Sequence, residues 1–265
     1  MTPISELPAA ACRGLRGVFC DIDDTLTWHG RLVPEAFLGL QRLRSAGLLV
    51  IPVTGRPGGW VDQIARLWPV DAVVGENGGL WFRMDDEHRM VRRFAQPDAE
   101  RVRHRAQLDA LASQILVEVP GAALASDQPY RELDLAIDFC EDVPRLSEAE
   151  IDRIVGAFER AGACCKVSSI HVNGWFGDFD KLSGCRALVR EWYGTDLEAE
   201  RDRWLYVGDS PNDAPMFGFF PLSVGVANVR RYLPRMASHP TYITEEPGGH
   251  GFAEVVERVL AARQA

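Results

Sequence analysis

Residues 17–25 have the sequence Gly-Val-Phe-Cys-Asp-Ile-Asp-Asp-Thr, in which an apolar run leads directly into three carboxylates. The apolar run predicts a short buried strand. Alternate residues of an extended segment point the same way, so Asp21 and Asp23 can face one site while Ile22 faces the core. Carboxylates about 4 Å apart repel each other by about 4 kcal/mol near a protein surface. Such a cluster favours a bound cation or a catalytic role; an acidic turn that caps the next helix is the simpler alternative.

The composition is typical of a soluble globular protein. The 265 residues are 46% hydrophobic and 25% charged, as in ordinary folded domains. The formal net charge of −9 argues against a nucleic-acid-binding surface, which would need a basic stripe. No apolar run approaches the roughly 18 residues of a membrane span, and the N-terminal residues lack the apolar segment of a signal peptide. We therefore expect a cytoplasmic protein that binds neither nucleic acid nor membranes.

Lysine and cysteine usage narrows the possible chemistry. Of the 29 basic residues, only Lys166 and Lys181 are lysine. A compact ammonium group has properties that the planar guanidinium of arginine cannot reproduce, so each lysine is a candidate for a special role. The six cysteines form no Cys-x-x-Cys pair and no zinc-type spacing, which favours reduced thiols.

The N-terminal third alternates between strands and helices. After the acidic loop we expect a helix at 34–46, a strand at 48–53, a helix at 59–67 and a strand at 72–74. This alternation indicates a doubly wound parallel sheet, a Rossmann-like α/β fold. Functional groups of such sheets gather at the carboxyl ends of the strands, and Asp21, Thr54 and Asn77 all follow predicted strands.

The pattern changes between about residues 83 and 177. The expected elements are a hairpin of 80–82 with 91–94, a polar helix at 98–114, strands at 133–139 and 166–172, and between them a helix that starts at the capping box of Ser147 and Glu150 and ends at Gly162. This mixture indicates a small inserted α+β domain. The doubly wound pattern resumes with helices at 181–192 and 251–262 and strands at 204–207 and 222–226. We expect a core of residues 1–82 and 178–265 with an inserted domain of residues 83–177.

Four groups of polar residues lie at predicted strand ends or helix starts: Asp21 with Asp23, Thr54, Lys181, and Asp209 with Asp213. Their order, with the insert between the threonine and the lysine, resembles the haloacid dehalogenase superfamily of phosphotransferases over nearly the whole chain. The place of the insert is similar to that of the type IIB cap group. That group includes Cof-like sugar phosphatases, sucrose phosphatase, trehalose-phosphate phosphatase, mannosylglycerate-phosphate phosphatase and an archaeal phosphoglycolate phosphatase. The resemblance implies an inserted cap that determines substrate specificity.

The resemblance also implies roles for the catalytic residues. Asp21 would be the nucleophile that forms an aspartyl-phosphate. Asp23 would act first as general acid toward the leaving alcohol and then as general base toward water. Lys181 would neutralise charge on the phosphoryl group. An acid at the position of Asp23 points to a phosphatase or mutase, because dehalogenases lack it and the ATPase branch has threonine there.

Binding roles follow from the same resemblance. Thr54 and the amide of Gly55 would hold phosphate oxygens, and Asn212 would orient the substrate or Asp209. The cofactor would be Mg²⁺, bound by Asp21, the backbone carbonyl of Asp23 and Asp209, with Asp213 holding a metal-bound water.

Weaker signals lie around these residues. Asn77 could touch the phosphate or fix the hinge of the cap, and a turn is an equal alternative. His171 and Asn173 could line the substrate pocket, although a lone histidine at a strand end is more often structural. Arg131 is a similar candidate, with a solvated strand edge as the favoured interpretation. We expect Arg56 to brace the threonine loop.

The sequence thus predicts a magnesium-dependent phosphatase of a small phosphorylated metabolite, a sugar phosphate or a phosphoglycerate- or phosphoglycolate-type ester. A phosphomutase on the same core is the alternative within enzymes. A phosphoacceptor signalling domain is the alternative from another class; it would use clustered aspartates, a threonine and a lysine, but without a large insert. The residues of the cap follow no readable code for the substrate, and nothing in the sequence indicates the oligomeric state.

Overall fold

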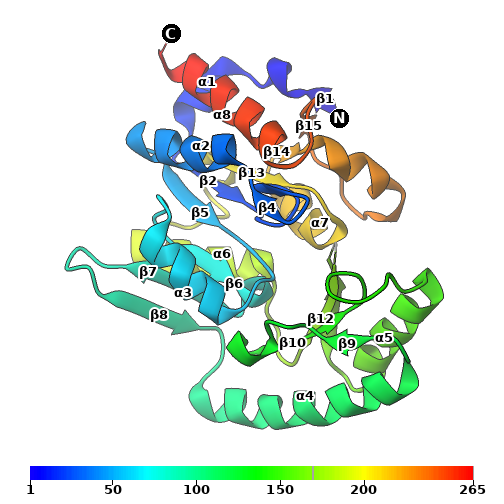
Figure 1. Ribbon diagram of the computed structural model, residues 1–265. Helices are drawn as coiled ribbons and strands as arrows, with labels where there is room; N and C mark the ends of the chain where they lie inside the picture. The colour runs from blue at the N-terminus through cyan, green and yellow to red at the C-terminus, as the bar shows by residue number, and fades with distance from the viewer. Residues whose placement is uncertain (169, 265) are drawn as a thin grey trace.

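The computed structural model describes residues 1–168 and 170–264. Figure 1 shows two lobes, a larger one that contains both termini and a smaller one built from helices α4 and α5 and strands β9 to β12. Within the described residues no helix is both long and apolar enough to cross a bilayer.

The larger lobe is organised around a six-stranded sheet in the order β1-β15-β14-β13-β2-β5. Its strands are β1 (Thr2–Pro3), β2 (Gly17–Cys20), β5 (Leu49–Pro52), β13 (Trp204–Gly208), β14 (Leu222–Gly225) and β15 (Tyr242–Ile243). Every neighbouring pair in this sheet is parallel. The predicted α/β class with a parallel sheet is therefore confirmed.

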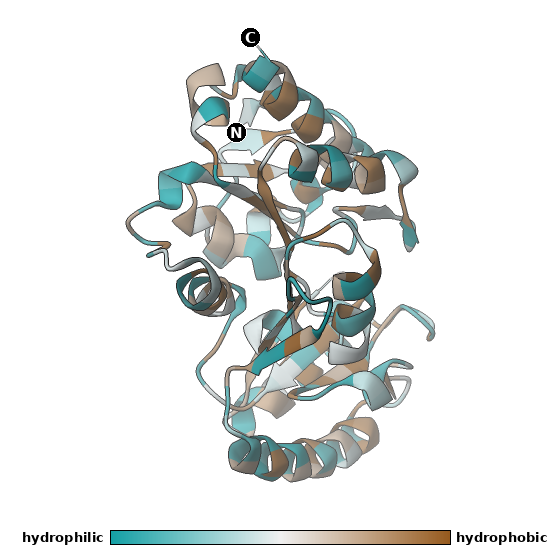
Figure 2. Ribbon diagram, turned by 90° about the vertical axis from the view of Figure 1, so that its left-hand side faces the viewer, coloured by the Kyte–Doolittle hydropathy of each residue, from teal (hydrophilic) through white to brown (hydrophobic). Residues whose placement is uncertain are grey.

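Helices cover both faces of this sheet. They are α1 (Ala9–Gly14), α2 (Pro34–Ser45), α3 (Gly58–Leu67), α6 (Lys181–Tyr193), α7 (Ala214–Phe219) and α8 (Gly248–Gln264). Val18 and Cys20 of β2 belong to one apolar cluster and Phe19 to another. Strand β2 is thus buried on both faces, which explains its unbroken apolar sequence. Figure 2 shows the hydrophobic residues concentrated along the central strands.

Two smaller sheets, a two-stranded hairpin and a three-stranded sheet, flank the six-stranded sheet. The first comprises β3 (Thr27–Trp28) and β4 (Arg31–Leu32), and the second sheet comprises β6 (Val73–Gly75), β7 (Leu80–Met84) and β8 (Met90–Phe94). A parallel bridge between Val53 and Val74 joins β6 to the end of β5. The predicted hairpin of residues 80–82 with 91–94 is confirmed by the pairing of β7 with β8.

The smaller lobe contains a four-stranded sheet in the order β11-β12-β10-β9. Its elements are α4 (Asp98–Glu118), β9 (Ala123–Leu124), β10 (Asp134–Asp138), α5 (Glu148–Arg160), β11 (Cys164–Val167) and β12 (His171–Trp175). The helices and strands share a third apolar cluster. The capping box of Ser147 and Glu150 is confirmed at the start of α5. The exact division at residues 83 and 177 stays a prediction.

The predicted single strand at 166–172 is wrong. The chain forms β11 and β12, which pair antiparallel, with Lys166 opposite Asn173. Between them the Ser168 hydroxyl accepts hydrogen bonds from the backbone N–H groups of Ile170, 3.3 Å, and His171, 2.9 Å. A serine side chain can stabilise a turn in this way without glycine or proline, so the sequence carried no strong turn signal here.

Candidate active site

The carboxyl ends of three parallel strands and one helix start form the candidate site. Asp21 follows β2, Thr54 follows β5, and Asp209 follows β13, while Lys181 is the first residue of α6. Strand β2 lies between β13 and β5 in the sheet. The topology therefore gathers residues that are up to 188 positions apart in the sequence.

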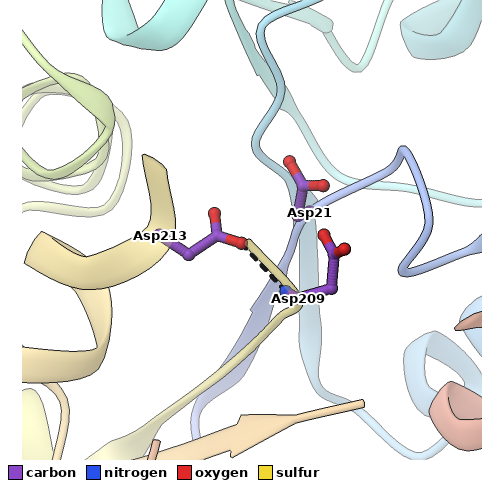
Figure 3. Close-up of side chains that lie close together, drawn as sticks. All are labelled: Asp21, Asp209 and Asp213. Atoms are coloured by element: carbon purple, nitrogen blue, oxygen red, sulfur yellow. Dashed lines mark hydrogen bonds between the residues drawn. The ribbon is translucent and has the colours of Figure 1, made fainter. Parts of the chain in front are cut away.

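Three buried aspartates face one another at the centre of the site. One carboxylate oxygen from each of Asp21, Asp209 and Asp213 lies within 4.8 Å of the others. Figure 3 shows these side chains converging from the two strand ends and from the turn that follows β13. Their exposed fractions are 4%, 1% and 0%, so water does little to screen their mutual repulsion.

Lys181 offsets part of this negative charge. Its Nζ donates hydrogen bonds to Asp21 Oδ1, 2.6 Å, and Asp213 Oδ1, 2.7 Å. Burial alone would lower the pKa of this ammonium group, but the two carboxylates raise it above its usual range. Lys181 is therefore a permanent cation between two acids, and the other lysine, Lys166, is exposed.

Asp213 is fully engaged by protein groups. Its Oδ2 accepts the backbone N–H groups of Asp209, 2.9 Å, and Ser210, 3.1 Å. Its Oδ1 accepts the Tyr206 hydroxyl, 2.5 Å, in addition to Lys181. These four contacts use the whole acceptor capacity of a carboxylate. In this arrangement Asp213 orients Lys181 and the loop of Asp209, and its contact with a metal-bound water stays a prediction.

The remaining two carboxylates fit a divalent cation. Burial raises the pKa of Asp21 to about 8; Lys181 opposes this increase, and Asp213 and Asp23 add to it. Burial, together with Asp21 and Asp213, also raises the pKa of Asp209 well above its usual range. Two ionised carboxylates are thus costly here without further positive charge. Clustered carboxylate oxygens are ligands that Mg²⁺ prefers.

The loop after β5 is tightly packed against the turn after β6. Thr54 is fully buried, its Oγ1 accepts the backbone N–H of Arg56, 3.0 Å, and its carbonyl accepts that of Asn77, 3.1 Å. A Cβ at Gly55 would lie only 3.2 Å from Asn77 Nδ2. Among the described residues, Asn77 Nδ2 is a buried donor without a hydrogen-bond partner. Asn77 is thus next to the loop predicted to bind phosphate.

Arg56 contacts the predicted acid–base residue. Its Nε donates to both carboxylate oxygens of Asp23, 3.0 and 3.1 Å, and its Nη2 donates to Oδ1, 2.9 Å. The same guanidinium reaches the smaller lobe, where Nη2 donates to Glu141, 3.0 Å, and Nη1 to Asp127, 3.4 Å. The expected role of Arg56 as a brace within its own loop is therefore too narrow, because it connects Asp23 to two acids of the smaller lobe.

The smaller lobe supplies a polar wall over Asp21. One cavity is lined by Asp21, Asp23, Gly55, Arg56, Ser210 and Asn212 of the larger lobe and by Arg131, Ser168, Ile170, His171 and Asn173 of the smaller lobe. Its volume is about 20 Å³, room for about one water molecule. A phosphomonoester needs more space, so side chains or lobes must move to admit it.

Arg131 is buried, so the favoured interpretation of a solvated strand edge is wrong. Its guanidinium donates to both oxygens of Asp127, 3.0 and 3.2 Å, and to both oxygens of Asp134, 2.9 and 3.0 Å. Nη1 also donates to the Gly55 carbonyl, 2.9 Å. Asn173 Nδ2 donates to Asp134 Oδ2, 2.9 Å. The predicted wall residues Arg131 and Asn173 thus share one carboxylate.

His171 and Asn212 also line this cavity, and their contact with a substrate stays a prediction. His171 Nε2 is 2.8 Å from Glu141 Oε2, and Asn212 Oδ1 accepts the Ser210 hydroxyl, 2.8 Å. Although burial favours the neutral acid, His171 and Arg56 lower the pKa of Glu141 to about 2. Glu141 was not foreseen, because it lies in an irregular loop that carries no pattern.

Asp209 has two further neighbours that the sequence did not single out. Asn228 Nδ2 donates to its Oδ2, 2.9 Å, and also to the backbone carbonyl of Asp24, 3.1 Å. The Thr25 hydroxyl is 3.4 Å from its Oδ1. Asn228 therefore fixes the loop after β2 against Asp209, and no local signal could have indicated it.

Comparisons with known proteins agree with this geometry. Residues 18–106 match the family model of haloacid dehalogenase-like hydrolases. A phosphoglycolate phosphatase of Methanothrix thermoacetophila is 25% identical over 258 residues, which covers 94% of this chain and 98% of the relative. The resemblance inferred from the ordered polar residues is thereby confirmed.

Solved structures share the fold at low sequence identity. A Thermoplasma acidophilum protein superposes with a TM-score of 0.70 at 18% identity, covering 93% of this chain and 98% of its own. The sucrose-phosphatase of Synechocystis sp. PCC6803, solved with sucrose and phosphate, gives a TM-score of 0.65 at 16% identity, with coverage of 93% and 98%. These two similarities concern the arrangement of the whole chain, both lobes included.

Proposed function

We propose that this chain, a phosphatase of the haloacid dehalogenase superfamily, is magnesium-dependent and hydrolyses a phosphomonoester of a small metabolite through an aspartyl-phosphate. One observation carries the proposal: Lys181 Nζ lies 2.6 Å from Asp21 Oδ1 in a buried cluster with Asp209. A nucleophilic carboxylate needs such an adjacent cation, because an incoming phosphate is itself anionic.

In the first half-reaction Asp21 attacks the phosphorus. A bond forms between its carboxylate oxygen and phosphorus, and the bond from phosphorus to the leaving oxygen breaks. Asp23 donates a proton to the leaving oxygen, which departs as an alcohol. Because Arg56 occupies both oxygens of Asp23, Asp23 must exchange this contact for the leaving group.

In the second half-reaction water replaces Asp21 on phosphorus. Asp23, now a carboxylate, accepts a proton from the attacking water. The bond between Asp21 and phosphorus breaks, inorganic phosphate leaves, and Asp21 returns to its starting state. Lys181 neutralises charge on the phosphoryl oxygens in both half-reactions.

The remaining residues bind and orient. Asp21, Asp209 and the backbone carbonyl of Asp23 would hold Mg²⁺, which would supply positive charge to offset that of the phosphoryl group. Thr54 and the Gly55 amide hold phosphate oxygens, Asn77 lies next to Gly55, and Asn212 orients the substrate.

The cavity favours a polar leaving group. Arg56, Arg131, His171 and Asn173 line it together with Asp21, and such groups bind hydroxyls or carboxylates rather than apolar surfaces. A sugar phosphate or a phosphoglycolate- or phosphoglycerate-type ester meets this requirement. Residues 83–177, which supply three of these four groups, form the cap that selects the substrate.

A phosphate-release assay tests the proposal. A panel of 2-phosphoglycolate, 3-phosphoglycerate and hexose phosphates is incubated with Mg²⁺, with and without chelator. We expect phosphate release from at least one ester, lost on chelation and lost in Asp21→Asn. A matched control is Asp98→Asn, since that side chain is 91% exposed. Full activity of Asp21→Asn would exclude the aspartyl-phosphate route, and an isomer formed without free phosphate would indicate a phosphomutase.

A further inference from the structure

A buried glutamate joins the two lobes at their base. Glu76 Oε1 accepts the backbone N–H groups of Gly58, 2.8 Å, and Glu132, 2.8 Å. Its Oε2 accepts those of Leu133, 2.6 Å, and Asp134, 3.2 Å. Gly58 begins α3 in the larger lobe, and the other three amides lead into β10 of the smaller lobe. One fully buried carboxylate therefore ties a helix start in one lobe to a strand start in the other.

The backbone around Glu76 is unusual. Glu76 and Asn77 have φ values of 45° and 53°, in the left-handed region that side chains other than glycine rarely adopt. A Cβ at Gly78 would lie 1.9 Å from the backbone oxygen of Asp180, the residue that precedes α6. The turn at 76–78 thus touches β10 and also the segment by which the chain returns to the larger lobe. Two successive strained residues persist where the surroundings determine them strongly.

The Glu76 contacts lie at one end of the smaller sheet. Asp134, the last of the three bonded residues, pairs with Trp175 at the end of β12. Trp175 is followed within a few residues by α6 of the larger lobe. Glu76 therefore contacts the smaller lobe close to the segment between β12 and α6, through which the chain returns to the larger lobe. A hinge between the lobes would lie at such a connecting segment.

The hydrogen bonds of Glu76 also determine the position of the smaller-lobe residues that line the cavity. Arg131 immediately precedes the three bonded amides, and its Nη1 reaches the Gly55 carbonyl, 2.9 Å. Asn173 reaches Asp134, 2.9 Å. A shift of residues 132–134 would move both groups relative to the loop predicted to bind phosphate.

We propose that Glu76 is a positioning residue for the phosphatase reaction: its carboxylate pins the base of the smaller lobe to the larger lobe and so fixes Arg131 and Asn173 over the Gly55 loop. This inference rests on the proposed function. Only a carboxylate fits, because four N–H donors converge on two oxygens. A glutamine has one acceptor oxygen and would direct its own N–H groups at some of these donors.

The test compares Glu76→Gln with Glu132→Gln. Glu132 is the neighbouring glutamate whose side chain is 52% exposed, so the same chemical change there leaves the joint intact. Amide hydrogen exchange is measured over residues 132–134, and kcat and KM are measured for 2-phosphoglycolate and for p-nitrophenyl phosphate. The p-nitrophenolate leaving group of the second ester is a good one, so its release should depend little on contacts with the smaller lobe.

We expect faster exchange at 132–134 in Glu76→Gln and a KM for 2-phosphoglycolate that rises at least about tenfold, as misplaced binding groups produce. The kcat for p-nitrophenyl phosphate should stay within about twofold, because Asp21 and Lys181 are not displaced. Glu132→Gln should match the wild type. If Glu76→Gln does not fold, Glu76→Asp replaces it; the shorter acid keeps the charge but cannot reach both lobes, so the same changes are expected at smaller size.

Two outcomes would overturn the inference. Unchanged exchange at 132–134 would show that the carboxylate does not pin β10. Equal losses for both esters would show a general structural defect and no positioning role. If the wild type releases phosphate from neither ester, the proposed function fails separately, and the exchange result still decides whether Glu76 joins the lobes.

Discussion

The two sides of the cavity are held in place in different ways. On the larger lobe, Asp21, Asp209 and Lys181 sit directly at strand ends or a helix start, so the parallel sheet positions them. On the smaller lobe, Arg131 and Glu141 are held by side-chain ion pairs. The difference teaches that the sheet topology places the groups proposed to be catalytic, whereas the groups proposed to contact the substrate from the smaller lobe depend on individual side-chain contacts.

The two sides of the cavity also differ in how their charges are balanced. Around Asp21, Asp209 and Asp213 the ammonium group of Lys181 offsets only part of the negative charge. A divalent cation would neutralise the rest. In the wall, Asp127 lies between the guanidinium groups of Arg56 and Arg131, so acids and bases alternate within the protein. Changes beside Asp21 should therefore mainly lower turnover, whereas changes on the smaller-lobe side should mainly affect stability and KM.

Lys181→Arg should have the largest effect. A guanidinium is too large and too differently shaped for the space between Asp21 and Asp213, so kcat should fall by about 10³-fold, the scale seen when one preorganised donor is lost. Steady-state phosphate release measures it. Lys166→Arg, on the exposed surface, is the matched control and should keep wild-type turnover. An equal loss in both variants would contradict a special role for Lys181.

Arg131→Met should mainly lower stability. The substitution leaves Asp134 buried without its cation and leaves Asp127 with only the 3.4 Å contact to Arg56, which costs about 3 kcal/mol of unfolding free energy. Urea denaturation measures the loss. The control is Arg160→Met, whose ion pair with Glu118 is 60% exposed on the arginine side and should contribute about 0.5 kcal/mol. Similar losses for both arginines would mean that the wall is no more dependent on its ion pairs than the surface.

Glu141→Gln should give a smaller loss that depends on pH. The pKa of Glu141 is lowered from 4.5 to about 2 in the folded protein, so its contribution to stability is complete above pH 4.5 and is lost as the pH falls toward 2. At pH 7 we expect the variant to be less stable by about 1.5 kcal/mol, as for a hydrogen-bonded charged group. The difference from wild type should narrow below pH 4.5 in urea titrations. A difference that is constant with pH would argue against the ion pair of Glu141 with Arg56 and its contact with His171.

The sequence predicted the larger-lobe side of the cavity because each of its residues has a local signature. An apolar strand ends before Asp21, Thr54 and Asp209, and a helix pattern begins at Lys181. Parallel pairing then brings those ends to one edge. The α/β class followed from the same alternation of strands and helices.

The wall was harder to predict because its contacts bridge the lobes. Arg131 precedes a strand and looks like a solvated edge until the Gly55 loop and Asp127 cover it. Glu76 was not singled out, since nothing in its own neighbourhood indicates that three amides near residue 133 will surround it. The turn between β11 and β12 was missed because Ser168 replaces the usual glycine or proline.

Ser147→Ala should have the smallest effect. The helix cap that it removes lies in the smaller lobe but, unlike the contacts between the lobes, was predicted from the sequence. Ser147 Oγ accepts the Glu150 N–H at the start of α5, and loss of such a cap costs about 1 kcal/mol. Ser113, an exposed residue inside α4, donates its hydroxyl to the carbonyl of Asp109, 3.3 Å, so Ser113→Ala should be nearly neutral in urea denaturation. Phosphate release should be unchanged in both variants. A fall in turnover with Ser147→Ala would mean that the cap of α5 affects the residues that line the cavity. Local structure in the smaller lobe and the contacts between the lobes would then not be independent.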